Sequence, residues 1–74
     1  MLNKIKEILV EELFVEEEDI NLNAHLQNDL LLDDLDILNL ITELEDQFEI
    51  SISDDVIVNF ETLQDIVNYL EVHV

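Results

Sequence analysis

Apolar residues recur at steps of three and four positions along three stretches of the chain, which is the spacing of amphipathic helices. The first stretch is marked by Leu2, Ile5, Ile8, Leu9 and Leu13. The last is marked by Leu63, Ile66, Val67 and Leu70, with Tyr69 near its end as a partly buried anchor. The pattern therefore predicts a helix at each end of the chain.

The middle stretch predicts the best-defined helix. Asp33 is a good N-cap, and Asp36 stands three residues later, where it completes a capping-box-like pair. The predicted core face comprises Ile37, Leu38, Leu40, Ile41, Leu44 and Phe48. A second stripe comprises Leu35, Asn39, Thr42 and Asp46. Leu35 is therefore expected to face solvent among polar neighbours.

The segments between these helices lack a sustained helical period. The first runs from about Val15 to Asp33 and begins with an acidic run, 16–19, that is typical of a solvated turn. Such a long connection is uncommon in a compact domain. We expect four apolar residues to pin it across the core: Ile20, Leu22, Leu26 and Leu30.

The second connection is expected to contain a short helix. Ser53 is a candidate N-cap, and residues 56–58 form a short helical turn or an apolar loop, with a strand as the alternative because of their β-branching. No partner strand is evident, so a short helix is favoured. Thr62 and Asp65 make a capping-box pair at the start of the last helix. The prediction is an all-α, up-and-down four-helix bundle, three main helices and one short helix, forming a single domain over residues 1–74.

Composition adds a strong charge to this picture. The 74 residues include 20 acidic residues against two lysines, for a net charge of −18. This field repels nucleic acid and anionic lipid and attracts basic partner surfaces. The chain has no cysteine, no apolar run as long as a membrane span and no signal-peptide pattern, so a cytoplasmic protein is expected. It also has no glycine or proline, which normally supply the special backbone angles of turns.

No pattern of catalytic or metal-binding residues stands out. The aspartates at 29, 33, 34 and 36 lack the EF-hand spacing and its glycine, although loose divalent binding stays open. His25 and His73 have no partner at ligand spacing and are expected to be exposed or capping residues. A small bundle without a polar cleft makes acid–base catalysis by paired carboxylates unlikely. We therefore expect neither an enzyme nor a specific metal site.

Two motifs carry a family resemblance. Residues 29–36 read D-L-L-L-D-D-L-D, and residues 44–48 read L-E-D-Q-F. They resemble the acyl carrier protein signature D-L-G-x-D-S-L-D, followed by a helix ending in L-E-x-x-F. The resemblance covers nearly the whole chain and implies an acyl-carrier-like four-helix bundle with a long first loop. It implies a carrier, not an enzyme, in fatty acid biosynthesis or a related pathway of lipid or polyketide metabolism.

Asp34 departs from this signature at its central position. In the family a serine there carries a 4'-phosphopantetheine arm, whose thiol holds the acyl chain as a thioester. A carboxylate cannot replace that hydroxyl, so no cofactor is expected in this form, whereas the arm is expected if position 34 were serine. Asp34 could reflect engineering, a natural paralogue without the arm, or an ordinary acidic residue favoured by the helix macrodipole.

Three further departures concern the backbone. Leu31 stands where the family has glycine, Phe14 stands where a glycine often follows the first helix, and Ser53 stands where many members have proline. We expect these changes to alter loop geometry at some loss of stability.

The resemblance also implies a docking face. It transfers partner binding to Asp33, Leu35, Asp36, Glu45 and Asp46. The expected partners are basic surfaces of synthases, transferases and phosphopantetheinyl transferase, which a monomer would meet by electrostatic steering. A merely solvated acidic face is the alternative. The residues implied to line an acyl-holding core are Ile41, Leu44, Phe48, Ile52, Ile57 and Leu63.

Two other hypotheses remain open. The chain could be an acidic interaction or regulatory protein without carrier activity. It could also be an idealised bundle with no biological role, as the absence of glycine and proline suggests.

Overall fold

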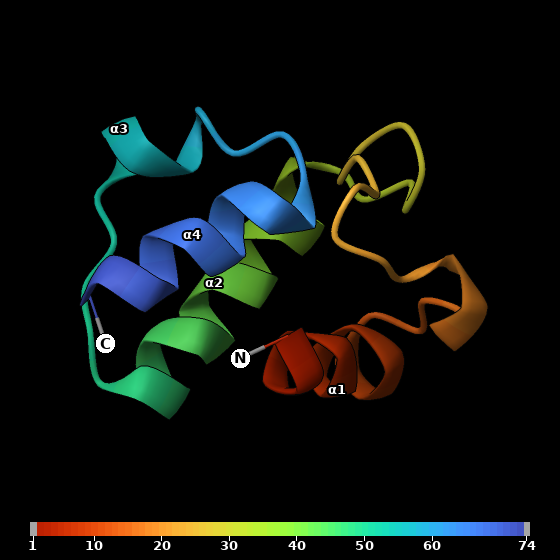
Figure 1. Cartoon of the computed structure of the whole chain (residues 1–74), viewed down its shortest axis with the longest axis horizontal. Coiled ribbons are helices and arrows are strands. Elements are labelled where there is room, and N and C mark those ends of the chain that lie inside the picture. Colours follow the sequence, from red (N-terminus) through yellow and green to blue (C-terminus); the bar gives the residue numbers. More distant parts are fainter. Residues whose placement is uncertain (1, 74) are drawn as a thin grey trace.

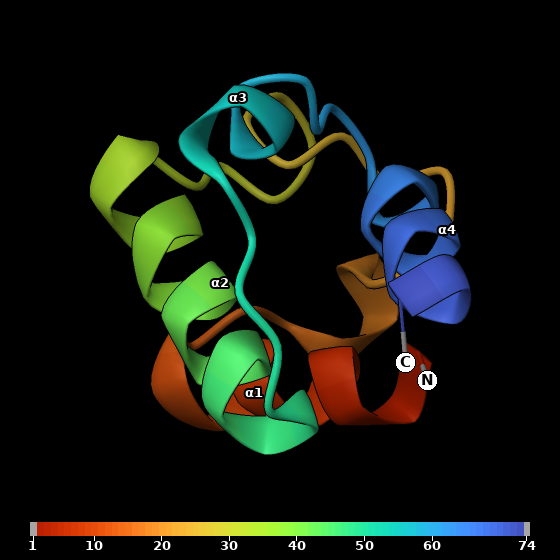
Figure 2. The same ribbon diagram turned by 90° about the vertical axis from the view of Figure 1, so that its left-hand side faces the viewer.

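The computed structural model describes residues 2–73, in which four α-helices and one short 3-10 helix surround a common core (Figure 1). The elements are α1 (Leu2–Glu12), η1 (Glu17–Asp19), α2 (Asp34–Phe48), α3 (Asp54–Ile57) and α4 (Leu63–His73). Figure 2 shows α2 and α4 on opposite sides of the core, with α1 and α3 closing the other two sides. Within the described residues, β-pairing is limited to an isolated bridge between His25 and Thr62. The predicted all-α bundle is confirmed.

The core is built from apolar residues of every major element. No buried polar or charged residue lies in the described part of the chain. The largest fully buried side chains are Ile5, Leu9, Leu26, Leu40, Ile41, Leu44, Leu63, Ile66 and Leu70. Because the buried set follows the three- and four-residue spacing of α1, α2 and α4, the periodicity predicted those core faces.

The predicted core face of α2 needs one correction. Leu38 is 49 % exposed, whereas Ile37, Leu40, Ile41 and Leu44 are buried as expected. Leu38 lies at the edge of the apolar stripe and lines an open groove between α2 and the segment after α3. The broad face drawn from the helical wheel was therefore too wide by one residue.

Local hydrogen bonds fix where the two longer capped helices begin. Asp33 accepts from the Asp36 backbone N–H at 2.8 Å, and Asp36 accepts from the Asp33 N–H at 3.4 Å. Asp65 and Thr62 form the corresponding pair at the start of α4, with distances of 3.2 and 3.4 Å. Both capping boxes were predicted. Ser53 is the N-cap residue of α3, but its side chain makes no capping hydrogen bond.

The long first loop is held in place by buried side chains and by the chain entering α4. Ile20, Leu26 and Leu30 are buried as predicted, and Leu22 packs partly against the core. Backbone hydrogen bonds join Leu26 N to the carbonyl of Glu61 at 2.8 Å, and Gln64 N to the carbonyl of Leu22 at 2.9 Å. The loop is therefore part of the folded core in spite of its irregular backbone.

His25 organises the tip of this loop. Its ring Nδ1 accepts from the backbone N–H groups of Gln27 and Asn28 at 3.2 and 3.1 Å. Its own backbone N–H donates to the Asp29 carboxylate at 2.7 Å. The predicted capping role of His25 is confirmed.

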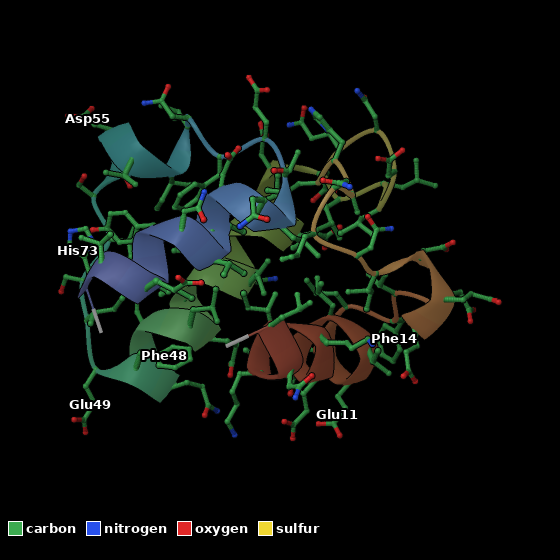
Figure 3. All side chains as sticks on the ribbon, viewed as in Figure 1. Glu11, Phe14, Phe48, Glu49, Asp55 and His73 are labelled. Carbon is green, nitrogen blue, oxygen red and sulfur yellow. The ribbon has the colours of Figure 1, made fainter. Side chains whose placement is uncertain are left out.

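Three non-glycine residues have left-handed backbone angles. Phe14, Leu31 and Glu49 have φ values of 58°, 58° and 55°. Figure 3 places Phe14 just beyond the end of α1 and Glu49 just beyond the end of α2. Side chains make this conformation unfavourable, which is why glycine usually occupies it. The backbone at Phe14 and Leu31 thus has the left-handed conformation that glycine favours, at two positions where the family resemblance implies glycine.

Candidate functional site

The start of α2 presents a carboxylate to solvent. Asp34 is the first residue of the helix and is exposed. Its neighbours Asp33 and Asp36 each accept a backbone hydrogen bond in the capping box, whereas Asp34 has neither a side-chain hydrogen bond nor an ion pair among the described residues. Of the three carboxylates, that of Asp34 is the one with neither oxygen engaged in the capping box.

Leucines close to Asp34 in the sequence are exposed. Leu35 is 65 % exposed and Leu31 is 80 % exposed. Leu35 and Leu38 are three residues apart on α2, so they are neighbours on the helix surface. The predicted exposure of Leu35 is confirmed, and Leu31 and Leu38 extend the exposed apolar surface at this end of α2.

A groove of about 370 Å³ opens beside Asp34, between α2 and the segment that contains α3. Residues of α2, of the first loop and of the end of α3 with the segment that follows it line this groove. Apart from Asp34 and Gln27, its lining is apolar. The lining residues are Gln27, Asp34, Ile37, Leu38, Ile57, Val58 and Phe60.

The other two predicted docking residues lie about 15 Å further along α2, at a rise of 1.5 Å per residue. Asp46 is exposed. Glu45 is half-buried, and its Oε2 accepts the backbone N–H of Ile52 at 2.8 Å. Glu45 therefore ties the segment after α2 back to the helix, a structural role that the motif did not predict.

The two lysines of the chain lie away from this surface. Both are on α1, where Lys4 pairs with Glu7 at 3.9 Å and Lys6 pairs with Glu17 at 3.7 Å. Since the chain has no arginine, no cation of the described chain neutralises the carboxylates at the start of α2. That surface is suited to a basic partner.

Comparison with known proteins identifies the family. The family model described as a phosphopantetheine attachment site matches residues 3–70, which include the whole of α2 and the groove. The chain belongs to the acyl carrier protein family. The predicted resemblance is confirmed, and with it the expectation of a carrier protein and not an enzyme.

Two curated relatives cover almost the full length of the chain. An acyl carrier protein of Phytoplasma australiense is 44 % identical over 71 residues, 96 % of this chain and 93 % of the relative. An acyl carrier protein of Exiguobacterium sibiricum is 38 % identical over 74 residues, the whole of this chain and 94 % of the relative. The family's cofactor is 4'-phosphopantetheine, as its description states.

His73 contacts Tyr69 of the same helix. His73 is exposed, stacks on Tyr69 with ring centroids 3.9 Å apart, and has its Nδ1 2.9 Å from the Tyr69 carbonyl oxygen. In residues 2–73 no three His, Asp or Glu side chains converge to hold a metal ion. Loose divalent binding to the acidic surface stays a prediction.

None of the helices in the described part of the chain is long and apolar enough to cross a membrane.

Sequence reasoning did not find the groove. Its apolar walls include Ile37 and Leu38, which were predicted to face the core, and residues 57 and 58, which were predicted to belong to a short helix. No local signal in the sequence indicates this groove, because its lining residues come from segments that are far apart along the chain.

Proposed function

We propose that this chain is an acyl carrier module in which Asp34 occupies the position of arm attachment. The supporting observation is that Asp34 is the exposed first residue of a capped helix, inside the segment that matches the phosphopantetheine attachment family. With a serine at this position the module would carry acyl intermediates on 4'-phosphopantetheine, in fatty acid or related biosynthesis in the cytoplasm. With Asp34 it stays in the unmodified form.

The chemistry of attachment explains the unmodified form. Transfer of the arm requires an alcohol oxygen to attack the β-phosphorus of coenzyme A, with loss of 3',5'-adenosine diphosphate and of the hydroxyl proton. A carboxylate is a weak nucleophile for this step. The product would be a mixed anhydride, which water cleaves readily.

We infer that the apolar core would accommodate an acyl chain by rearrangement of its contacts. The proposed lining residues are Ile41, Leu44, Phe48, Ile52, Ile57 and Leu63. Ile41, Leu44 and Leu63 are fully buried within one cluster, and Ile57 also lines the groove beside Asp34. We infer that an acyl chain would enter through this groove and displace core contacts.

The proposed partners are the basic surfaces of synthases, transferases and phosphopantetheinyl transferase. The proposed contacts are Asp33, Leu35, Asp36, Glu45 and Asp46. A monomer with a net charge of −18 would be drawn to such surfaces at long range and bind them weakly and quickly.

The first testable prediction is that restoring serine restores the attachment site. Incubated with coenzyme A and a promiscuous phosphopantetheinyl transferase, the Asp34 protein keeps its mass, whereas Asp34→Ser gains one arm. Ser and Asp are about equal near a helix N-terminus, so this substitution changes the free energy of unfolding by only a few tenths of a kcal/mol. Intact-protein mass spectrometry measures the outcome.

A matched control uses the other helix that starts with aspartate. Asp54 is the first residue of α3, as Asp34 is of α2, and it follows a Ser N-cap. Asp54→Ser is expected to gain no arm. An arm on the Asp34 protein itself would contradict the disabled attachment site.

A second candidate function is that of an acidic interaction or regulatory protein without carrier activity. Asp34 favours this function because its side chain lacks the hydroxyl needed for attachment of the arm. The exposed leucines at positions 31, 35 and 38 also favour it. A folded Asp34→Ser variant that several transferases refuse would support this second function.

A further inference from the structure

We propose that the tip of the first loop, residues 25–30, is a pH-sensitive switch in which protonation of His25 loosens the loop from the start of α4. The neutral imidazole holds the tip closed, and the imidazolium lets it open. The inference concerns the local stability of the loop, so it does not depend on the proposed carrier function.

His25 has the position of an N-cap in a single helical turn. Its carbonyl accepts the N–H groups of Asp29 and Leu30, both at 3.0 Å. Its ring Nδ1 accepts those of Gln27 and Asn28, two and three residues further on, at 3.2 and 3.1 Å. An N-cap side chain, usually that of serine, threonine, aspartate or asparagine, accepts from these same relative positions. The Asp29 carboxylate accepts the His25 N–H at 2.7 Å, as the reciprocal bond of a capping box does.

This geometry requires a particular protonation state of the ring. A ring nitrogen that accepts hydrogen bonds carries no hydrogen, so the hydrogen of the neutral ring is on Nε2. In the imidazolium both ring nitrogens are donors, and Nδ1–H would face two backbone N–H groups. Rotation of the ring does not restore the cap, because it brings another N–H group to the same place. Protonation of His25 therefore removes both hydrogen bonds.

The cap is continuous with the hydrogen bonds that attach the loop to the rest of the fold. His25 forms the isolated β-bridge with Thr62, and the next residue, Leu26, donates its N–H to the carbonyl of Glu61 at 2.8 Å. The carbonyl of Leu26 in turn accepts the N–H of Leu32 at 3.0 Å, two residues before α2 begins. Loss of the cap therefore weakens the attachment at the start of α4 and the approach to α2 together.

The charged groups along these hydrogen bonds are carboxylates. Asp29 accepts the His25 N–H from the same loop. At the entrance to α4, Glu61 follows the loop, and its N–H donates to the carboxylate of Asp65 at 2.9 Å. The two lysines of the chain pair with glutamates of α1 and η1 instead. An imidazolium can therefore turn toward negative charge and away from the two amide donors.

The test measures amide hydrogen exchange by NMR between about pH 5 and 8, the range in which histidine ordinarily changes its charge. The rates are corrected for the intrinsic effect of pH and compared with those of α1 amides, which report the stability of the whole fold. We expect the relative protection of the Leu26, Leu30 and Leu32 amides to fall about fivefold toward acid, the ratio for loss of a typical N-cap. Over the same range the nitrogen resonances of the His25 ring should change from one hydrogen, on Nε2, to two.

Variants separate the titration of the ring from the cap itself. His25→Asn supplies a side-chain oxygen that caps a helical turn but does not titrate, so protection should stay high at every pH. His25→Ala removes the acceptor, so protection should be low at every pH. His73→Asn is the matched control, since His73 is the second histidine of the chain and lies at the end of α4. This control should retain the response of the loop to pH.

Two outcomes would overturn the inference. One is an unchanged relative protection of the loop amides over the range in which the His25 ring gains its second hydrogen. The other is the same loss of protection in His25→Asn, which would assign the response to the carboxylates of Asp29, Glu61 and Asp65. Neither measurement involves attachment of an arm, so failure of the switch and failure of the carrier function can be distinguished.

Discussion

At the scale of single residues, the absence of glycine is the most consequential feature of the chain. Three side-chain-bearing residues adopt the left-handed conformation: Phe14 and Glu49 just after helices, and Leu31 in the loop before α2. For ordinary L-residues this conformation is less favourable by about 1–2 kcal/mol. Phe14 and Leu31 are also 86 % and 80 % exposed, so their side chains recover little by burial. The fold therefore tolerates strain at positions where glycine would relieve it.

Glycine at these positions should stabilise the protein. Phe14→Gly, Leu31→Gly and Glu49→Gly remove the left-handed penalty of about 1–2 kcal/mol, offset by the larger unfolded-state entropy of glycine, about 0.5–1 kcal/mol. Each should raise the free energy of unfolding by about 0.5–1 kcal/mol, as measured by urea denaturation.

Leu35→Gly is the control for these substitutions. Leu35 is similarly exposed but has helical geometry inside α2, so glycine there should lower stability by about 1 kcal/mol. A loss of stability in Leu31→Gly comparable to that in Leu35→Gly would show that the left-handed angle carries no penalty here.

At the scale of elements, α2 combines structural and exposed carboxylates on one helix. Asp33 and Asp36 cap its start, and Glu45 holds the N–H of Ile52 near its end. Asp34 and Asp46 are exposed and make no such bond among the described residues. Substitutions that test docking are therefore best made at Asp46, since reversing Asp36 would also break the capping box.

Charge reversal at Asp46 should slow docking without unfolding α2. We expect Asp46→Lys to reduce the association rate with a phosphopantetheinyl transferase several-fold at low salt, because electrostatic steering is weakened. The difference should shrink as salt screens the charges. Stopped-flow association measures the rate, and circular dichroism verifies the helical content.

Glu71→Lys provides the same change of net charge on α4, from an exposed position outside the proposed docking face. It should slow association less than Asp46→Lys does. Equal slowing by both variants would show that the net charge, and not the α2 face, governs docking.

At the scale of the whole molecule, a small folded domain carries a large net negative charge. Twenty acidic residues belong to a molecule whose principal extents are only 27 × 21 × 20 Å. The two lysines form only exposed or half-exposed pairs with glutamates on α1 and η1, and such pairs contribute about 0–1 kcal/mol each. Repulsion between carboxylates is therefore left largely uncompensated, and the fold should respond to screening.

The melting temperature should rise with salt. Sodium chloride shortens the screening length and weakens the repulsion. Calcium or magnesium chloride should act more steeply per mole, because divalent ions also associate with clustered carboxylates. Thermal unfolding followed by circular dichroism measures both effects, with matched ionic strength separating screening from divalent binding. A melting temperature that responds to neither salt would contradict self-repulsion as a limit on stability.

Much of the architecture could be predicted from the sequence because its signals are local. The spacing of Ile5, Ile8 and Leu9 determines the buried face of α1, and Asp33 with Asp36 determines where α2 begins. The motif around Asp34 also identified the family before any geometry was known. These properties depend on residues within one or two helical turns, so neighbouring sequence is sufficient.

Contacts between distant segments decided the rest. Leu38 is exposed although it belongs to the apolar stripe of α2, and the groove exists only where residues 57–60 lie opposite the start of α2. Glu45 gains its structural role from Ile52, seven residues away across a turn. The long loop is fixed by the pairing of Leu26 with Glu61. Periodicity reports which face of an element is apolar but not which neighbour covers it, so only the tertiary structure could place these groups together.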